Sequence, residues 1–117
     1  MLKSLPELIA ETTAHIRTVD AKTAKAERAL NNGFLIDVRE PAEADVKSAV
    51  GSTNIPRGIL EMKITGVCTD VDTPIYLHCA SSGRARLATE QLLRMGYQNV
   101  TAISCDIDKV CRAFQDD

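Results

Sequence analysis

Short runs of apolar residues recur along the chain and predict the strands of a sheet. The run at 34–38 is interrupted only by Asp37, and the run at 75–78 reads Ile-Tyr-Leu-His. Nearly continuous apolar runs of this length are typical of strands buried on both faces. Weaker patterns predict further strands at 16–19, 52–54 and 100–103.

Segments with helical spacing separate these strands. Ser4 and Glu7 match a capping box, which predicts a short N-terminal helix. Asp20 is a suitable N-cap for a second helix, which is expected to stop at 31–33 with Gly33 as its C-terminal cap. Further helices are predicted at 42–47, 57–63, 84–95 and 107–114.

Strands that alternate with helices are typical of a parallel sheet with right-handed crossovers and helices on both faces. The pattern therefore predicts an α/β fold, a three-layer α/β/α arrangement around a mostly parallel sheet of about five strands. The chain has 117 residues, which is the length of one domain. We expect 1–117 to form that domain, with 1–15 as a helical extension.

The composition argues against several classes of partner. Aromatic residues make up only 3% of the chain and Trp is absent, which disfavours stacking platforms for bases. The net charge is −2, with basic and acidic residues interspersed, so neither nucleic acid nor a membrane surface is an expected partner. No apolar run approaches the roughly 18 residues of a membrane span.

The chain contains four cysteines, Cys68, Cys79, Cys105 and Cys111. The N-terminal residues lack the apolar segment of a signal peptide, so we expect a cytoplasmic protein whose thiols stay free. There is no C-x2-C pair, and neither His15 nor His78 completes a ligand cluster. We therefore expect no metal and no other cofactor.

Cys79 has the most informative surroundings of the four cysteines. It directly follows the strand at 75–78, and ligands of open α/β sheets bind at the carboxyl ends of strands. Small residues separate it from Arg84 at the start of the next helix: Ala80, Ser81, Ser82 and Gly83. Such a loop can turn its N–H groups toward one point near the positive end of the helix dipole. The pattern predicts an anion site and a nucleophilic thiolate.

Several segments, taken in order, resemble the rhodanese-like sulfurtransferases, and the resemblance covers about 19–114. They are 34–41, 54–58, 76–81 and 95–100. The active-site pattern of that family is a cysteine with an arginine five positions on, which Cys79 and Arg84 satisfy. The resemblance implies that Cys79 accepts a sulfane sulfur as a persulfide. It also implies that the backbone N–H groups of 80–84 stabilise the persulfide and that Arg84 helps to bind an anionic donor such as thiosulfate.

Two details of the loop distinguish this chain from similar proteins. Related phosphatases and arsenate reductases carry the arginine six positions after the cysteine, where this chain has Ala85. The family usually has glycine at the position of Ser82, so Ser82 would cost about 1 kcal/mol or more if a positive φ is required there. Arg86 fits neither arginine pattern and is interpreted as a charge on the helix surface.

Each of the other polar residues near the predicted site has a structural interpretation as well as a functional one. Arg57 either lines the pocket mouth, where it would attract anionic donors, or is a solvated surface charge. Asp37 and Arg39 are expected to hold the neighbouring loop by hydrogen bonds. His78 is expected to be a core histidine with its hydrogen bonds satisfied, in preference to an acid–base group.

The other three cysteines also have predicted roles. The resemblance places the segment of Cys105 beside the pocket, and one hypothesis is that Cys105 resolves a Cys79 persulfide by forming a disulfide. The simpler reading makes Cys105 a small apolar wall residue. Cys68 and Cys111 are interpreted as structural residues.

These observations predict a sulfurtransferase that moves a sulfane sulfur from a small anionic donor to a thiol, cyanide or protein acceptor through Cys79. The alternative is a persulfide carrier or protein-interaction module with little turnover of small molecules. A monomer or a weak dimer is expected, without a cofactor, nucleic acid or membrane as partner.

Overall fold

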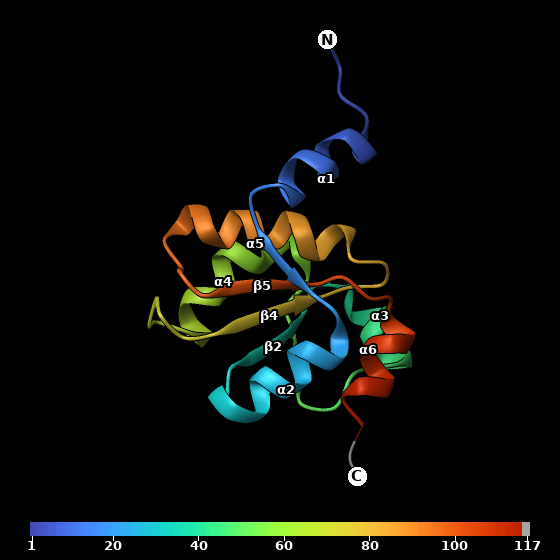
Figure 1. The fold of residues 1–117 in the computed structure, drawn as a ribbon, viewed down its shortest axis with the longest axis vertical. Coiled ribbons are helices and arrows are strands. Elements are labelled where there is room, and N and C mark those ends of the chain that lie inside the picture. The colour runs from blue at the N-terminus through green and yellow to red at the C-terminus, as the bar shows by residue number, and fades with distance from the viewer. Residues whose placement is uncertain (116–117) are drawn as a thin grey trace.

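A central sheet of parallel strands organises the chain (Figure 1), whose computed structural model describes residues 1–115. The five strands pair in the order β1-β5-β4-β2-β3, and every pair is parallel. Their bounds are Arg17–Val19 (β1), Phe34–Asp37 (β2), Ser52–Asn54 (β3), Ile75–His78 (β4) and Val100–Ile103 (β5). The predicted α/β class and the number and direction of the strands are confirmed.

Helices cover both faces of this sheet. They are α1 (Leu5–Thr13), α2 (Ala21–Asn31), α3 (Pro41–Val46), α4 (Leu60–Val67), α5 (Gly83–Met95) and α6 (Ile107–Ala113), with a 3-10 turn at Arg57–Ile59 before α4. Figure 1 shows α4 and α5 on one face and α2 on the other. None of the helices within residues 1–115 is both long enough and apolar enough to cross a membrane.

The core consists of two apolar clusters, one on each face of the sheet. Ile36 and Leu77 pack with α4 and α5, whereas their neighbours Leu35 and Tyr76 pack with α2 and α6. Successive side chains of a strand point to opposite faces. The apolar runs of β2 and β4 are continuous because both faces of these strands are covered.

The end of α2 differs from the expectation. Asn32, at φ 55°, takes the left-handed conformation that was expected of a glycine cap, and Gly33 does not have a positive φ. Asparagine adopts this conformation more readily than most residues because its short polar side chain tolerates it. Gly33 has a different constraint, since a Cβ atom there would lie 2.7 Å from the carbonyl oxygen of Pro74.

The N-terminal helix begins as the capping box predicts. The Ser4 hydroxyl accepts a hydrogen bond from the Glu7 N–H at 3.2 Å. α1 then packs against α5 (Figure 1), and Thr12 in its last turn is buried. The extension therefore lies on the helix that follows Cys79.

Candidate active site

Cys79 lies at the carboxyl end of β4, at the boundary between sheet and loop. Its side chain is 1% exposed and belongs to the apolar cluster under α4 and α5. The Ala85 N–H, in the first turn of α5, donates to Cys79 Sγ at 3.4 Å. This donor, together with the N-terminal end of the α5 dipole, favours negative charge on the sulfur.

The loop between Cys79 and α5 contains a strained residue. Ser82 has φ 77°, in the left-handed region, and it immediately precedes the helix. Strain was expected at Ser82 if its φ is positive, and it is positive. The backbone strain therefore costs about 1 kcal/mol. The conformation turns the chain sharply enough for α5 to start directly beside the sulfur.

The backbone N–H groups of residues 80–84 form a set of free donors. Within the described part of the chain, none of the five donates to a protein acceptor. The loop is nevertheless fixed on both sides. The Ala80 carbonyl accepts from the Ile107 N–H at 3.0 Å, and the Ser82 carbonyl accepts from the Arg86 N–H at 2.9 Å. Free N–H groups on a fixed loop beside a thiol are suited to binding an anion or a charged sulfur.

Arg84 is paired with a carboxylate that sequence reasoning missed. Its two terminal nitrogens donate to Glu43 of α3, at 2.7 and 3.0 Å. These hydrogen bonds, helped by the Glu40 N–H, lower the pKa of Glu43 from 4.5 to about 2. In the sequence, Glu43 reads only as a capping residue for α3, and nothing indicates its long-range partner.

Arg57 is likewise paired, with Glu61 one helical turn further on. Its guanidinium donates to the Glu61 carboxylate at 2.8 Å. The two arginines that were expected to attract anionic donors, Arg57 and Arg84, thus each face a carboxylate.

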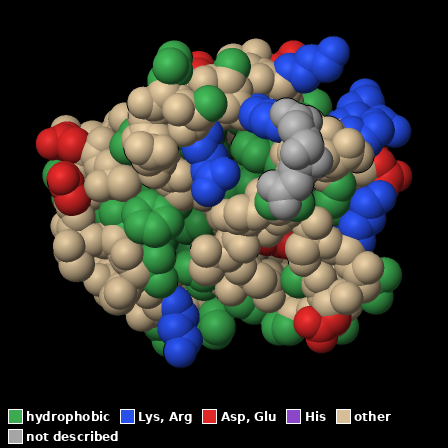
Figure 2. All heavy atoms as spheres, turned by 90° about the horizontal axis from the view of Figure 1, so that it is seen from below, with side chains coloured by type: hydrophobic (Ala, Val, Ile, Leu, Met, Phe, Trp, Pro, Cys, Tyr) green, Lys and Arg blue, Asp and Glu red, His purple; other side chains and the backbone are tan. Residues whose placement is uncertain are grey.

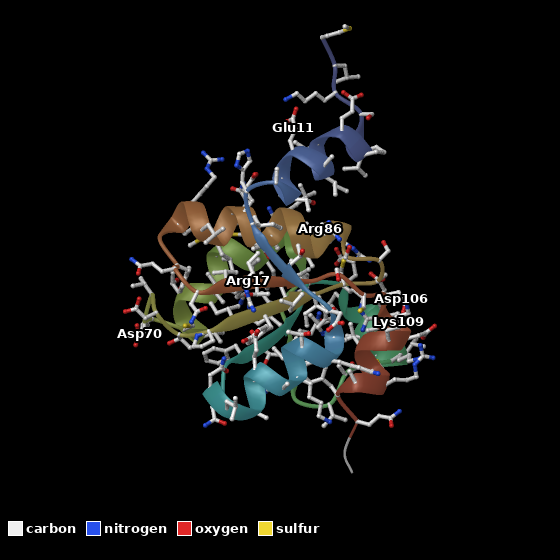
Figure 3. The ribbon with its side chains drawn as sticks, viewed as in Figure 1. Glu11, Arg17, Asp70, Arg86, Asp106 and Lys109 are labelled. Carbon is white, nitrogen blue, oxygen red and sulfur yellow. The ribbon has the colours of Figure 1, made fainter. Side chains whose placement is uncertain are left out.

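Arg86 is not the surface charge that was expected. Its Nε donates to Ser82 Oγ at 3.1 Å, and its Nη1 donates to Thr13 Oγ1 at 2.9 Å. Figure 3 shows Arg86 on the side of α5 that faces α1. The interpretation failed because Thr13 lies in the extension, which the sequence does not connect to the loop.

Asp37 and Arg39 form a buried ion pair at the end of β2. Their side chains are 1% and 4% exposed, and Arg39 donates to both carboxylate oxygens of Asp37. Arg39 also donates to the Lys47 carbonyl at 2.6 Å. The pair thereby ties β2 to the segment after α3.

His78 is buried, but its hydrogen bonds are not satisfied as expected. Within residues 1–115, neither ring nitrogen has a hydrogen-bond partner. Burial lowers the pKa of His78 to about 4, although nearby Asp37 raises it, and Arg39 lowers it further. The ring is therefore neutral at pH 7 and does not add charge beside Cys79.

Cys105 faces away from the cluster that contains Cys79. Its Sγ accepts from the Ala21 N–H at 3.3 Å, and it packs with the cluster under α2 and α6. It lines a surface groove of about 550 Å³ together with Asp20, Ala21, Lys22, Lys109, Arg112 and Ala113. Figure 2 views the molecule from the side of α2, where several Lys and Arg side chains are exposed. The resolving role of Cys105 stays a prediction.

The other two cysteines, Cys68 and Cys111, lie outside the loop of residues 80–84. All four thiols are free, and Cys68 is buried while Cys111 is half-buried. Burial raises the pKa of the Cys111 thiol. Among residues 1–115, no three His, Cys, Asp or Glu side chains are grouped closely enough to hold a metal ion.

Comparison with known proteins identifies the fold and the domain type. The model of the rhodanese-like domain matches residues 20–113. A solved structure from Rhodopseudomonas palustris, a protein of unknown function described as a possible tyrosine phosphatase, superposes with a TM-score of 0.84. The alignment covers 97% of this chain and 92% of that one, at 22% identity, which shows a shared fold only.

Two relatives are similar in sequence over part of their length. The uncharacterised protein YqhL of Bacillus subtilis is 39% identical over 62 residues, which is 53% of this chain and 48% of that protein. The adenylyltransferase and sulfurtransferase UBA4 of Meyerozyma guilliermondii is 33% identical over 82 residues, which is 64% of this chain and 19% of that protein. The matched segments thus span less than half of either relative.

Proposed function

Because the chain belongs to the rhodanese-like domain family, we propose that it is a sulfurtransferase that carries a sulfane sulfur on Cys79. One observation supports this proposal most directly: the Cys79 sulfur lies beside a fixed loop, residues 80–84, whose five N–H groups have no acceptor among residues 1–115. The sulfurtransferase from Meyerozyma guilliermondii, with which the chain shares 33% identity over 82 residues, supports the same chemistry.

The proposed reaction has two displacement steps. In the first, the Cys79 thiolate attacks the outer sulfur of thiosulfate. The S–S bond of the donor breaks, sulfite leaves with its electron pair, and Cys79 holds a persulfide. In the second, a thiolate or cyanide attacks the terminal sulfur, and the Cys79 thiolate leaves. Neither step needs an oxidant, and the free N–H groups of 80–84 stabilise the charged terminal sulfur.

The same loop is poorly suited to phosphoryl transfer. The transferring phosphoryl group carries charge on three equatorial oxygens, which an arginine typically binds through two parallel N–H groups. Both terminal nitrogens of Arg84 are already occupied by Glu43. The position of a phosphatase arginine, six residues after Cys79, holds Ala85.

A second candidate function is a persulfide carrier that receives sulfur from a protein. The observation that favours it is the pairing of Arg84 with Glu43 and of Arg57 with Glu61. Paired arginines attract a small dianion weakly, because the carboxylates cancel much of their field. A protein donor brings its own binding surface and does not depend on this attraction.

The test combines turnover with mass spectrometry. Thiosulfate-to-cyanide transfer is measured on the wild type, Cys79→Ser and the matched control Cys111→Ser, which removes a free thiol outside the loop. Turnover that is lost only in Cys79→Ser supports the enzyme, whereas one added sulfur on Cys79 without turnover supports the carrier. Release of phosphate from an aryl phosphate that depends on Cys79 would contradict both functions.

A further inference from the structure

The N-terminal helix α1 lies outside the family match, which begins at residue 20, yet it contacts the loop beside Cys79. Ile9 Cδ1 lies so close to Gly83 that a Cβ atom there would be 3.2 Å from it. Thr12, in the last turn of α1, is 1% exposed. The extension therefore packs on the start of α5, and this contact is unlike that of a loosely attached tail.

A chain of hydrogen bonds runs from α1 to the strained residue of the loop. Thr13 Oγ1 donates its one hydrogen to the Ile9 carbonyl at 2.7 Å, which leaves its lone pairs to accept from Arg86 Nη1 at 2.9 Å. Arg86 Nε then donates to Ser82 Oγ at 3.1 Å. Arg86 thus bridges a hydroxyl on α1 and a hydroxyl in the loop.

The hydrogen-bonded bridge ends at Ser82, whose backbone conformation is unfavourable for any residue other than glycine. Ser82 has φ 77°, a conformation that a non-glycine residue keeps only where its surroundings hold it. The N–H groups of Gly83, Arg84 and Ala85 follow directly, and that of Ala85 donates to Cys79 Sγ. A change in the Ser82 backbone would turn the Ala85 N–H away from the sulfur.

We propose that Arg86 and Thr13 are positioning residues through which α1 holds Ser82 in its left-handed conformation and so sets the reactivity of the Cys79 thiol. The inference deepens the proposed sulfur-transfer function, on which its biological meaning rests. It concerns the thiol itself, however, so its test needs no sulfur donor.

The experiment measures the rate at which iodoacetamide alkylates each cysteine at pH 7, read by peptide mass spectrometry. Arg86→Gln removes the charged bridge, and Thr13→Val removes the hydroxyl on α1, with its hydrogen bonds to Arg86 and to the Ile9 carbonyl, at nearly constant shape. Arg94→Gln, an exposed residue in the last turn of the same helix, is the matched control. The other three thiols serve as internal references for global loosening of the fold.

Both bridge variants are expected to slow the alkylation of Cys79 at pH 7 about tenfold, because the Ala85 N–H no longer donates to the sulfur. In the Ser82→Gly background the effect of Arg86→Gln should vanish, since glycine takes a positive φ without strain. This rescue separates positioning of the loop from general stabilisation.

Three results would overturn the proposal: an unchanged rate of Cys79 alkylation in both bridge variants, an equal effect of Arg86→Gln with and without Ser82→Gly, or a parallel change at all four cysteines. Absence of thiosulfate-to-cyanide turnover in the wild type would count against the proposed function alone. Normal turnover in the wild type that is lost in Cys79→Ser, together with an unchanged rate of Cys79 alkylation in Arg86→Gln, would count against the inference alone.

Discussion

Replacing Glu43 with glutamine releases the charge of Arg84 beside the Cys79 loop. Glutamine keeps the size of the side chain and one hydrogen-bond acceptor, but it removes the carboxylate that receives hydrogen bonds at 2.7 and 3.0 Å. The freed guanidinium is then available to a thiosulfate dianion. We expect Glu43→Gln to lower the KM for thiosulfate.

The size of this effect follows from the exposure of the pair. The side chains of Arg84 and Glu43 are 37% and 36% exposed, so water screens their charges. One additional unit attraction at about 4 Å in water is worth about 1 kcal/mol. That energy corresponds to a KM about fivefold lower, and the gain should shrink as ionic strength rises.

The assay is steady-state transfer from thiosulfate to cyanide at several salt concentrations. Glu90→Gln on α5 is the matched control, because it removes the same charge and Glu90 makes no ion pair within residues 1–115. A KM that is unchanged, or that falls equally in Glu90→Gln, would refute the idea that Glu43 restrains Arg84. A fall in kcat at constant KM would instead indicate a role for Glu43 in orienting the loop.

Further predictions concern stability and thiol chemistry. The pKa of Glu43 is about 2 in the fold and 4.5 as its ordinary value, so its contribution to folding stability is full above pH 4.5 and is lost as pH falls toward 2. Solvent screening limits this contribution to about 1 kcal/mol. Urea unfolding of Glu43→Gln should lack this loss of stability. The pKa of His78 is lowered from 6.5 to about 4, so the unfolded chain binds the proton first and stability declines as pH falls between these values, by up to about 3 kcal/mol. His78→Leu should flatten that decline in urea unfolding followed by circular dichroism, and an equal decline in the variant would assign it to another group. Ser82→Gly should raise stability by about 1 kcal/mol, seen as a higher Tm, and a lower Tm would mean that the Ser82 hydroxyl contributes more than the backbone strain costs. If Cys105 resolves the persulfide, its thiolate attacks Cys79 Sγ and hydrosulfide leaves. Sulfur-loaded protein then yields a Cys79–Cys105 disulfide peptide by mass spectrometry, which Cys105→Ser abolishes and Cys111→Ser retains; its absence under every condition would remove the hypothesis.

The fold was predictable because its signals are local. The apolar runs that became β2 and β4, and the caps at Ser4 and Asp20, each depend on neighbouring residues alone. The alternation of strands and helices then constrains the sheet to be parallel. One local error, at Asn32 and Gly33, arose because both residues can adopt the left-handed conformation and packing against Pro74 decided between their roles. Another concerns the helix predicted at 57–63, where a 3-10 turn occupies Arg57–Ile59 and α4 runs over Leu60–Val67.

The candidate site was predictable only along the segment that contains Cys79. The position of the thiol at a strand end and the strain at Ser82 follow from the loop sequence. The partners of Arg84 and Arg86 do not, because Glu43 and Thr13 lie 41 and 73 residues away in the chain. Likewise, no pattern in the sequence reveals that the ring nitrogens of His78 lack hydrogen-bond partners within residues 1–115, since that depends on what packs around the ring from other strands.

The left-handed backbone at Ser82 also bears on how related chains are expected to diverge. A serine in this conformation needs support from elsewhere, whereas a glycine does not. In an alignment of homologues, serine at this position should co-occur with an N-terminal helix that carries a hydroxyl like Thr13, and glycine should occur with or without one. Loss of the helix and a return to glycine would then be coupled events in the history of the domain.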